Sequence, residues 1–302
     1  MIDLQVVKPL PPSRPKQNFF WQSLLKLGTY FTLSLFLLQG LTKAASLPVP
    51  MNADWGPTTY SLAGAAAAIV SNHDSFLTNP AGIFYYSGQT SLGGMWEKMP
   101  GKLSNWSASV VDGSNDIVGG FQFADTNANG LIRQNYTLDT AYKTPYGAIG
   151  VSIHGVRLRG VEPGRGWHLT NSVGVIVPLG GIVTLGIYSK SPYDLEKDHY
   201  FPPSIHMGVM YSKEGALRAT FETGRRFRIE DQDWYYAVAG DILMQKYLAI
   251  RGGYRWDHEQ GKSFWSMGGA LLAPKIEMTG TYIRTTTGPK SNGYGFDVTF
   301  RF

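Results

Sequence analysis

Apolar and polar residues alternate along most of this chain, and the pattern is clearest at its end. Tyr294, Phe296, Val298 and Phe300 recur at every second position and Phe302 closes the series, while glycine, aspartate, threonine and arginine fill the positions between. A period of two is that of a β-strand, whose successive side chains point to opposite faces. The last ten residues therefore predict a strand with one apolar and one polar face.

Similar alternations follow one another from Ser87 to Phe302, separated by turn sequences such as Asp112-Gly113-Ser114-Asn115 and Lys213-Glu214-Gly215. We count fourteen candidate strands, although twelve would also fit, and no part of this region predicts a helix. The region allows about 15 residues for each strand with its connection, which suits a tilted membrane-spanning strand of roughly 9 to 11 residues and a short loop. We expect an all-β, transmembrane antiparallel β-barrel over residues 87–302.

The positions opposite the apolar residues carry charges of both signs. In a membrane barrel these side chains would face the lumen, because charges turned towards lipid are costly. A soluble β-sandwich would instead bury the apolar face against a second sheet, and the same positions permit that arrangement. In the barrel interpretation the predicted lumen-facing residues are Arg133, Asp139, His154, His206, Arg218, Glu222, Arg251, Arg255, Asp297 and Arg301.

Composition favours the membrane. Charged residues make up only 16% of the chain, whereas about 25% is usual in globular proteins. Mean hydropathy is only −0.14, as expected when alternation averages a lipid face against a lumen face. The absence of cysteine excludes a lipoprotein anchor and disulfides. The net charge of +5 does not indicate nucleic acid, because basic residues are scattered; the densest cluster, at 225–228, fits a solvated loop or lipid headgroups.

Residues 1–44 predict a disordered lead followed by a signal peptide. Basic residues precede the apolar stretch Leu27–Leu41, and cleavage is expected after Ala44. An uncleaved membrane anchor is the competing interpretation, but the stretch is interrupted by polar residues and is shorter than the roughly 20 apolar residues that a span needs. Export, aromatic residues near strand ends and Phe302 together place the protein in the bacterial outer membrane.

Two partners follow from that location: the lipid of the outer membrane and the machinery that inserts barrels into it. A terminal aromatic residue in alternation with apolar residues resembles the signal by which the insertion machinery engages the final strand. The residues that would supply it here are Phe296, Val298, Phe300 and Phe302.

Residues 45–86 have a different character. The alanine-rich run from Ser61 to Val70 predicts a short, slim helix. Asn79 precedes a proline and is therefore expected outside the helical region, while Gly82 could adopt a positive φ. We expect this segment to turn sharply and to fit the mouth of the barrel, although a linker helix followed by a generic tight turn is the simpler alternative.

The motif of this segment resembles the amino-terminal hatch of the FadL-type transporters of hydrophobic compounds, whose smaller relatives include a secretion-associated barrel. Asn79, Pro80, Ala81 and Gly82 match the motif, and Asp74 occupies the acidic position that often precedes it. The resemblance implies a fourteen-stranded barrel plugged by residues 45–86 and the uptake of a hydrophobic small-molecule ligand. The transporters are considerably longer, with extended loops; here the longest candidate loops are Gly155–Leu169 and Lys190–Pro203.

Catalytic chemistry is poorly supported. Ser152 and His154 share a strand face, as do Ser204 and His206, but the sequence places neither an orienting carboxylate nor an oxyanion hole. The run at 257–259 is a solvated turn rather than a metal site. We therefore expect no enzyme, no cofactor and no metal, and a monomer. Two hypotheses remain: uptake of small hydrophobic compounds through a lumen gated by the hatch, or a structural or secretion-associated barrel that binds a protein partner.

Overall fold

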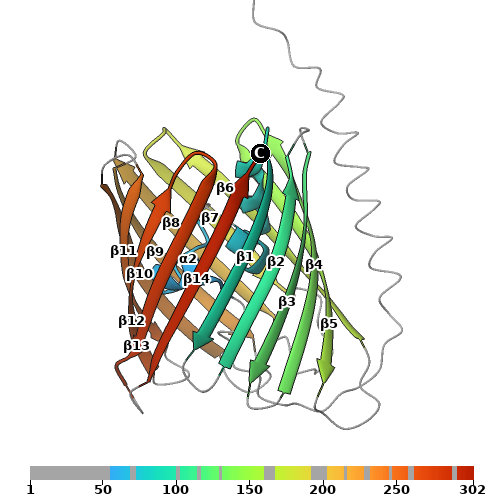
Figure 1. Ribbon diagram of the computed structural model, residues 1–302. Coiled ribbons are helices and arrows are strands. Elements are labelled where there is room, and N and C mark those ends of the chain that lie inside the picture. Colours follow the sequence, from blue (N-terminus) through green and yellow to red (C-terminus); the bar gives the residue numbers. More distant parts are fainter. Residues whose placement is uncertain are drawn as a thin grey trace, which may run out of the picture. The chain divides into compact units, whose positions relative to one another are not determined.

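The computed structural model describes residues 55–68, 73–99, 103–113, 117–128, 131–159, 167–191, 203–213, 216–227, 232–244, 247–257, 262–287 and 291–302. The predicted lead and signal peptide, residues 45–54 and 69–72 of the predicted hatch, and residues 192–202 of the predicted loop Lys190–Pro203 lie outside these ranges. Figure 1 shows that the remaining chain forms a barrel of tilted strands. In the part of the chain that the structure describes, no helix is long and apolar enough to cross a membrane.

Each strand pairs antiparallel with its neighbours in the sequence, and β1 pairs with β14 to close the barrel. The fourteen-stranded all-β prediction is confirmed. The strands are β1 (Thr90–Met99), β2 (Leu103–Asp112), β3 (Ile117–Ala128), β4 (Leu131–Thr144), β5 (Gly147–Arg159), β6 (Trp167–Leu179), β7 (Val183–Lys190), β8 (Ser204–Lys213), β9 (Leu217–Phe227), β10 (Gln232–Met244), β11 (Leu248–Asp257), β12 (Lys262–Leu272), β13 (Ile276–Thr285) and β14 (Asn292–Arg301).

Strand β2 shows how the alternation builds two faces. Trp106 is 47% exposed on the outside, whereas its near neighbour Val111, on the opposite face, is fully buried. Exposed and buried residues alternate along the whole strand, as a period of two requires. One predicted loop is shorter than expected, because Gly155 pairs with Leu169 and Arg157 with Trp167, so that much of Gly155–Leu169 belongs to β5 and β6.

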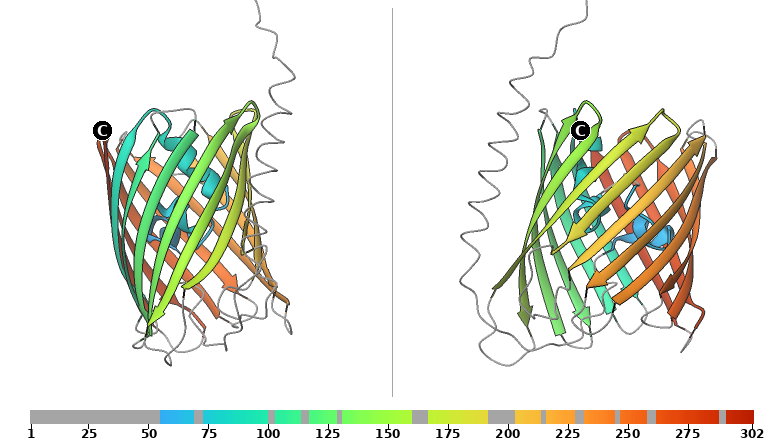
Figure 2. Two further views of the ribbon diagram at one scale, coloured as in Figure 1. Left: turned by 90° about the vertical axis from the view of Figure 1, so that its right-hand side faces the viewer. Right: turned by 180° about the vertical axis from the view of Figure 1, so that it is seen from behind.

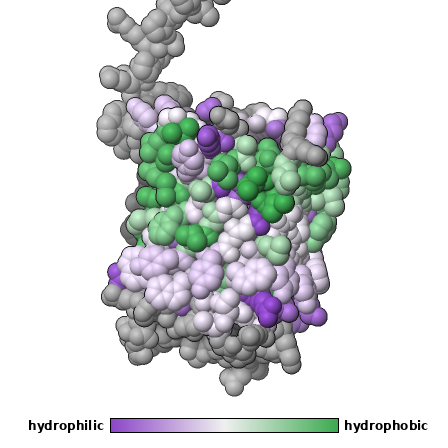
Figure 3. Space-filling view, turned by 90° about the vertical axis from the view of Figure 1, so that its left-hand side faces the viewer, coloured by the Kyte–Doolittle hydropathy of each residue, from purple (hydrophilic) through white to green (hydrophobic). Residues whose placement is uncertain are grey.

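The outer surface is divided along the barrel axis. We call the end where β1 ends and β2 begins the loop end, and the opposite end, which holds Thr90 and Phe302, the turn end. Figure 3 shows a hydrophobic band next to a paler band nearer the loop end. Aromatic rings gather towards the loop end, where Trp106, Phe123 and Tyr136 lie on successive strands with ring centroids 5.1 and 5.0 Å apart. Such a girdle suits a membrane–water interface.

Inside the barrel lie α2 (Pro57–Ser61) and two 3₁₀ helices, η2 (His73–Leu77) and η3 (Pro80–Tyr86), as both views of Figure 2 show. We call their described residues, 55–68 and 73–86, the plug segment. Its contacts reach both halves of the barrel: α2 packs on β11 to β14 and β1, and η3 packs on β2 to β6.

Two local predictions for this segment are wrong and one is confirmed. The alanine run is not helical, because Ala63 and Gly64 adopt positive φ angles of 51° and 85°, which end α2 just after Ser61. Gly82 does not take a positive φ but lies within η3. Asn79 is extended, with φ −93° and ψ 110°, as its position before a proline predicts.

Candidate functional site

The barrel wall is shaped for the plug segment by glycines on its inner face. A Cβ at Gly186 would lie 1.9 Å from the carbonyl oxygen of Ala67, and one at Gly150 would lie 2.3 Å from the backbone nitrogen of Ala81. Any larger residue would push the plug away from the wall. The glycines that meet the plug in this way are Gly93, Gly120, Gly150, Gly174, Gly186, Gly208, Gly253, Gly268 and Gly295, spread over nine strands.

Asn79 joins three parts of the chain. Its Oδ1 accepts a hydrogen bond from the backbone N–H of Ala81 at 3.1 Å and so caps η3, with Pro80 at the first helical position. Its Nδ2 donates to the carbonyl of Ala67 at 2.8 Å and to that of Val175 on β6 at 3.3 Å. The predicted motif residues therefore fasten the plug segment to itself and to the wall, and Ala81 fits against Gly150.

Asp74 connects η2 with α2. Its Oδ2 accepts from the backbone N–H of Thr59 at 2.7 Å, and its carbonyl accepts from the hydroxyl of Thr78 at 3.1 Å. Burial raises the pKa of Asp74 to about 6, although the hydrogen bond from Thr59 acts in the opposite direction. Gly56 packs directly on this carboxyl group, because a Cβ there would lie 1.9 Å from Oδ1.

His73, which the sequence did not single out, connects the plug to the first two strands. Its Nδ1 is hydrogen-bonded to the hydroxyl of Ser109 and its Nε2 to the hydroxyl of Ser91, the latter at 3.0 Å. Burial, together with the charge of Arg301, lowers the pKa of His73 to about 3. The imidazole therefore stays neutral at ordinary pH and acts as a structural hydrogen-bonding group.

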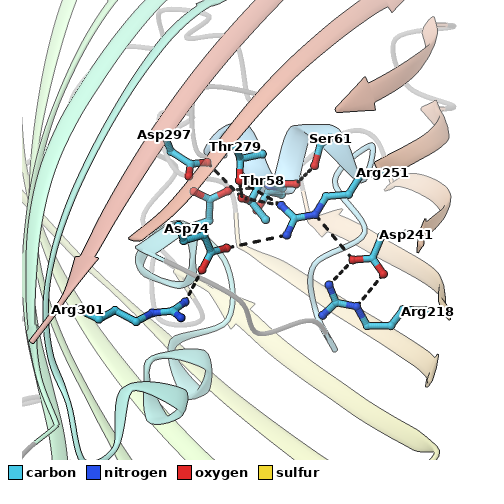
Figure 4. A network of polar contacts seen from close by, with 11 residues as sticks. Thr58, Ser61, Asp74, Arg218, Asp241, Arg251, Thr279, Asp297 and Arg301 are labelled. Atoms are coloured by element: carbon cyan, nitrogen blue, oxygen red, sulfur yellow. Dashed lines mark hydrogen bonds and ion pairs between the residues drawn. The ribbon is translucent and has the colours of Figure 1, made fainter. Parts of the chain in front are cut away.

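A network of arginines and carboxylates holds α2 on the other side (Figure 4). Arg251 lies at its centre, and its Nη1 donates to the hydroxyls of Thr58 and Thr279 at 3.1 and 3.3 Å. Thr58 in turn donates to Asp297 at 3.2 Å. The ion pairs around this centre are Arg218–Asp241, Arg251–Asp241, Arg251–Glu277 and Arg301–Glu277.

Because these buried charges are mutually paired, removing one partner would leave another charge buried and uncompensated. The structure thus brings together Arg218, Arg251, Asp297 and Arg301 of the predicted lumen residues, with Asp74 nearby in the plug. Arg133, Asp139 and His154 lie elsewhere on the inner face: Arg133 and Asp139 are buried on β4, and His154 is hydrogen-bonded to Thr137 and Ser172, each at 3.0 Å.

A second anchor centres on Glu222. One carboxylate oxygen accepts the backbone N–H of Ala67 at 2.6 Å, and the other accepts the hydroxyl of Tyr235. His206 is hydrogen-bonded to Tyr235 and, through Nε2, to the hydroxyl of Ser204 at 2.9 Å, and its Nδ1 lies 3.5 Å from Glu222. A carboxylate therefore does orient His206, but its second oxygen is occupied by the plug. The visible role of this chain of contacts is to hold the plug segment.

An apolar cluster lies in the lumen towards the loop end. It joins plug and wall and consists of Trp55, Tyr60, Ala63, Met99, Leu103, Ala128, Phe264 and Ile283. Arg255 is fully buried beside it, with its guanidinium 4.4 Å from the ring centroid of Trp55 and 3.4 Å from that of Tyr235. The guanidinium also pairs with Asp257 at 3.2 Å. The guanidinium of Arg255 thus lies against the rings of both Trp55 and Tyr235, and this cation–π contact holds Trp55 at the start of the plug segment.

The middle of the wall on β2 to β5 is different, since small hydroxyl and amide side chains are frequent on its inner face. Buried examples are Asn105, Ser107, Gln122, Thr126, Asn135, Thr137 and Ser152. Within the described residues no group of three or more histidine, cysteine, aspartate or glutamate side chains could hold a metal ion. These polar residues lie between two apolar clusters, the one described above and a second one at the turn end, formed by Phe76, Ile83, Tyr86, Val111, Val118 and Ala141.

Several of these functional residues were missed from sequence. His73, Thr58 and Tyr235 are ordinary residues in their local patterns, and their partners lie far away in the chain. The glycines at inward positions were a usable signal, because a strand interior rarely tolerates glycine without a close neighbour.

Comparison with solved structures identifies the fold. The monoaromatic hydrocarbon channel CymD superposes with a TM-score of 0.69 at 12% identity, covering 82% of this chain and 97% of CymD. The toluene transporters TbuX of Ralstonia pickettii and TodX of P. putida give TM-scores of 0.66 and 0.63 at 10% identity, each covering 82% of this chain and 98% of the other.

No protein-family model matches the sequence, and neither does any curated protein. At identities this low the likeness establishes the fold and nothing finer. The predicted resemblance is confirmed at that level: this chain has the FadL-type barrel fold, which it shares with these hydrocarbon channels and transporters.

Proposed function

We propose that this protein is a monomeric channel of the bacterial outer membrane for small hydrophobic compounds, closed by a hatch comprising residues 45–86. The proposal is supported by the fold shared with hydrocarbon channels and by an outer surface that suits lipid. It involves no catalytic step, cofactor or metal.

The apolar cluster in the lumen carries the proposal. The lumen of a water-filled pore is polar, yet Trp55, Met99, Leu103, Phe264 and Ile283 gather in one place at the loop end. These side chains are at most 8% exposed, so a hydrophobic compound must displace some of their mutual contacts to enter. It then gains free energy by leaving water, at roughly 25 cal/mol per Å² of buried apolar surface. The other apolar cluster, around Val111 and Val118, lies at the turn end, so the cluster at the loop end is the expected site of first capture.

Passage beyond the cluster requires the plug segment to shift, because its residues fill the space between opposite walls. The driving force is the gradient of the ligand itself, and no nucleotide or coupled ion is needed. The plug segment can separate from the wall most easily at Ala67. Its N–H and carbonyl are hydrogen-bonded to the side chains of Glu222 and Asn79, and these bonds can break while the hydrogen bonds between the strands stay intact.

A disulfide lock tests this mechanism. The chain has no native cysteine, and the Cβ of Ala67 lies 3.0 Å from the position of a Cβ at Gly208, a few tenths of an ångström short of the usual span in disulfides. We expect cells whose only copy is the oxidised Ala67→Cys, Gly208→Cys variant to lose uptake of labelled toluene and to regain it on reduction.

The matched control places a disulfide within the wall. Ser107 and Ala124 are directly opposite on β2 and β3, so Ser107→Cys with Ala124→Cys staples two strands and leaves the plug free. Uptake by the oxidised control should equal that of the wild type. If the locked variant also transports toluene normally, the plug does not move and the gating part of the proposal is wrong.

The tight seating of the plug favours a second candidate, a structural or secretion-associated barrel that binds a protein partner. Nine inward glycines and many buried hydrogen bonds would suit a permanent closure as well as a movable one. Deletion of the gene separates the two: unchanged growth on hydrophobic carbon sources together with loss of a secreted protein would support the second candidate and exclude the first.

A further inference from the structure

Four basic residues on the outer surface of the loop end are each paired with an aromatic residue on the next strand. Arg157 is directly opposite Trp167, Arg225 opposite Trp234 and Arg284 opposite Trp265, and Lys98 is opposite Tyr294. The guanidinium of Arg225 lies 5.4 Å from the ring centroid of Trp234 and 5.3 Å from that of Phe227. The same combination thus recurs at four places around the barrel.

The two ends of the barrel differ in outward charge. Among the described residues, the outward strand positions of the loop end carry Lys98, Arg157, Arg159, Arg225 and Arg284 against a single acid, Asp125, which accepts a hydrogen bond from Gln134. The outward strand positions described at the turn end carry one acid and one base, Asp112 and Lys213. Positive charge is therefore concentrated beside the aromatic girdle at the loop end.

Two of the four base–aromatic pairs lie in the sector from β12 to β1. Arg284 on β13 and Lys98 on β1 are separated only by β14, which places their backbones on the order of 10 Å apart, within reach of long side chains that bend towards each other.

Basic side chains at this depth extend from the apolar belt towards the headgroups, while the neighbouring ring remains at the interface. Guanidinium and ammonium groups there are the usual donors to phosphate. An acidic protein segment would also meet the charge, but it would not explain why four of the five basic residues lie beside a ring that faces lipid.

We propose that the outward basic residues of the loop end, above all Arg284 and Lys98, bind the phosphate groups of the glycolipid lipid A. This inference rests on the proposed outer-membrane location, in which the loop end contacts the outer leaflet. The aromatic partner holds each basic side chain at headgroup depth, and the lipid in turn fixes the height of the barrel in the membrane.

Native mass spectrometry of the full-length protein in detergent tests the proposal, with lipid A and dephosphorylated lipid A as probes. We expect lipid A to bind and the dephosphorylated form not to bind. The double variant Lys98→Gln, Arg284→Gln should weaken lipid A binding about 30-fold, which follows from about 1 kcal/mol per basic residue at the membrane surface and 1.4 kcal/mol per factor of ten. Lys213→Gln at the turn end is the matched control and should bind as the wild type does.

Three results would overturn the proposal: equal binding of the dephosphorylated lipid, unchanged binding by the double variant, or phosphatidylglycerol binding as tightly as lipid A. Heat-modifiability on gels establishes that each variant is a folded barrel. The measurement is independent of transport, so normal lipid A binding without toluene uptake refutes only the channel proposal, and the reverse result refutes only this one.

Discussion

Gly186 on β7 is the position where the fit between wall and plug can be tested most directly. A Cβ there would lie 1.9 Å from the carbonyl oxygen and 2.4 Å from the carbonyl carbon of Ala67. Both distances are far inside van der Waals contact, so in Gly186→Ala the plug must retreat by about 1 Å or more at this point. Ala67 is also where Glu222 and Asn79 hold the plug, and a shift of that size strains both hydrogen bonds.

Overpacking of this kind costs about 1 to 3 kcal/mol. The barrel ladder is not involved, so the cost falls on the seated state of the plug. At 1.4 kcal/mol per factor of ten, the ratio of displaced to seated plugs should rise about 5- to 140-fold. We expect Gly186→Ala to open more often in planar bilayers and to show higher leak conductance, while it remains heat-modifiable on gels.

Gly119→Ala is the matched control, because a Cβ at Gly119 has no atom within 4 Å and it points outward from β3. A second test variant, Gly174→Ala, places a Cβ 2.0 Å from Oδ1 of Asn79 and should act in the same direction. If Gly186→Ala and Gly174→Ala conduct like Gly119→Ala and the wild type, the inner glycines do not seat the plug and the reasoning fails.

Three further predictions concern the membrane surface, assembly and pH. Val173→Arg, on the lipid face at the middle of β6, should lower the free energy of unfolding in vesicles by about 2 to 4 kcal/mol, whereas Leu169→Arg near the loop end should lower it by about 0 to 1; equal losses would contradict the membrane assignment. Deletion of Phe302, which is 75% exposed, should slow insertion so that exported chains accumulate unfolded, and a normal yield of folded barrel in cell fractions would refute this. Since the folded pKa of His73 is about 3 and the unfolded value about 6.5, its contribution to plug stability is complete above pH 6.5 and declines as pH falls towards 3; leak conductance should rise over that range in the wild type, and a His73→Gln variant with the same rise would refute the assignment.

The barrel could be predicted from sequence because its signal is local. In strands such as β2 and β14, the alternation of neighbouring residues determines which face each side chain takes. A shift of one residue in the strand pairing would turn every charged side chain of the strand towards lipid. Closure between β1 and β14 then follows from the need to satisfy the backbone groups of both edge strands in a bilayer.

The plug was harder to predict because its conformation is imposed from a distance. The alanine run has a high helix propensity, yet the backbone N–H and carbonyl of Ala67 bond to Glu222 and Asn79 instead, and tertiary contacts outweigh a propensity of a few tenths of a kcal/mol per residue. Asn79 behaved as predicted because a proline restricts its neighbour whatever lies around it. Gly82 did not, because glycine permits a positive φ without requiring one.

The inner glycines combine a local sequence signal with a cause that lies far away in the chain. Each occupies a position that strand alternation assigns to the lumen, so its direction is a local property that sequence can supply. Its cause is not local: Gly174 makes room for Asn79, almost a hundred residues away, and Gly268 makes room for Ser61. A glycine weakens a strand interior unless another backbone must approach it closely, and nine such positions facing inward therefore imply a closely packed body in the lumen. The same pattern constrains the mechanism, since a plug that fits nine contact points cannot tilt as a rigid body without clashing, and any opening must begin in a part of it that separates from the rest.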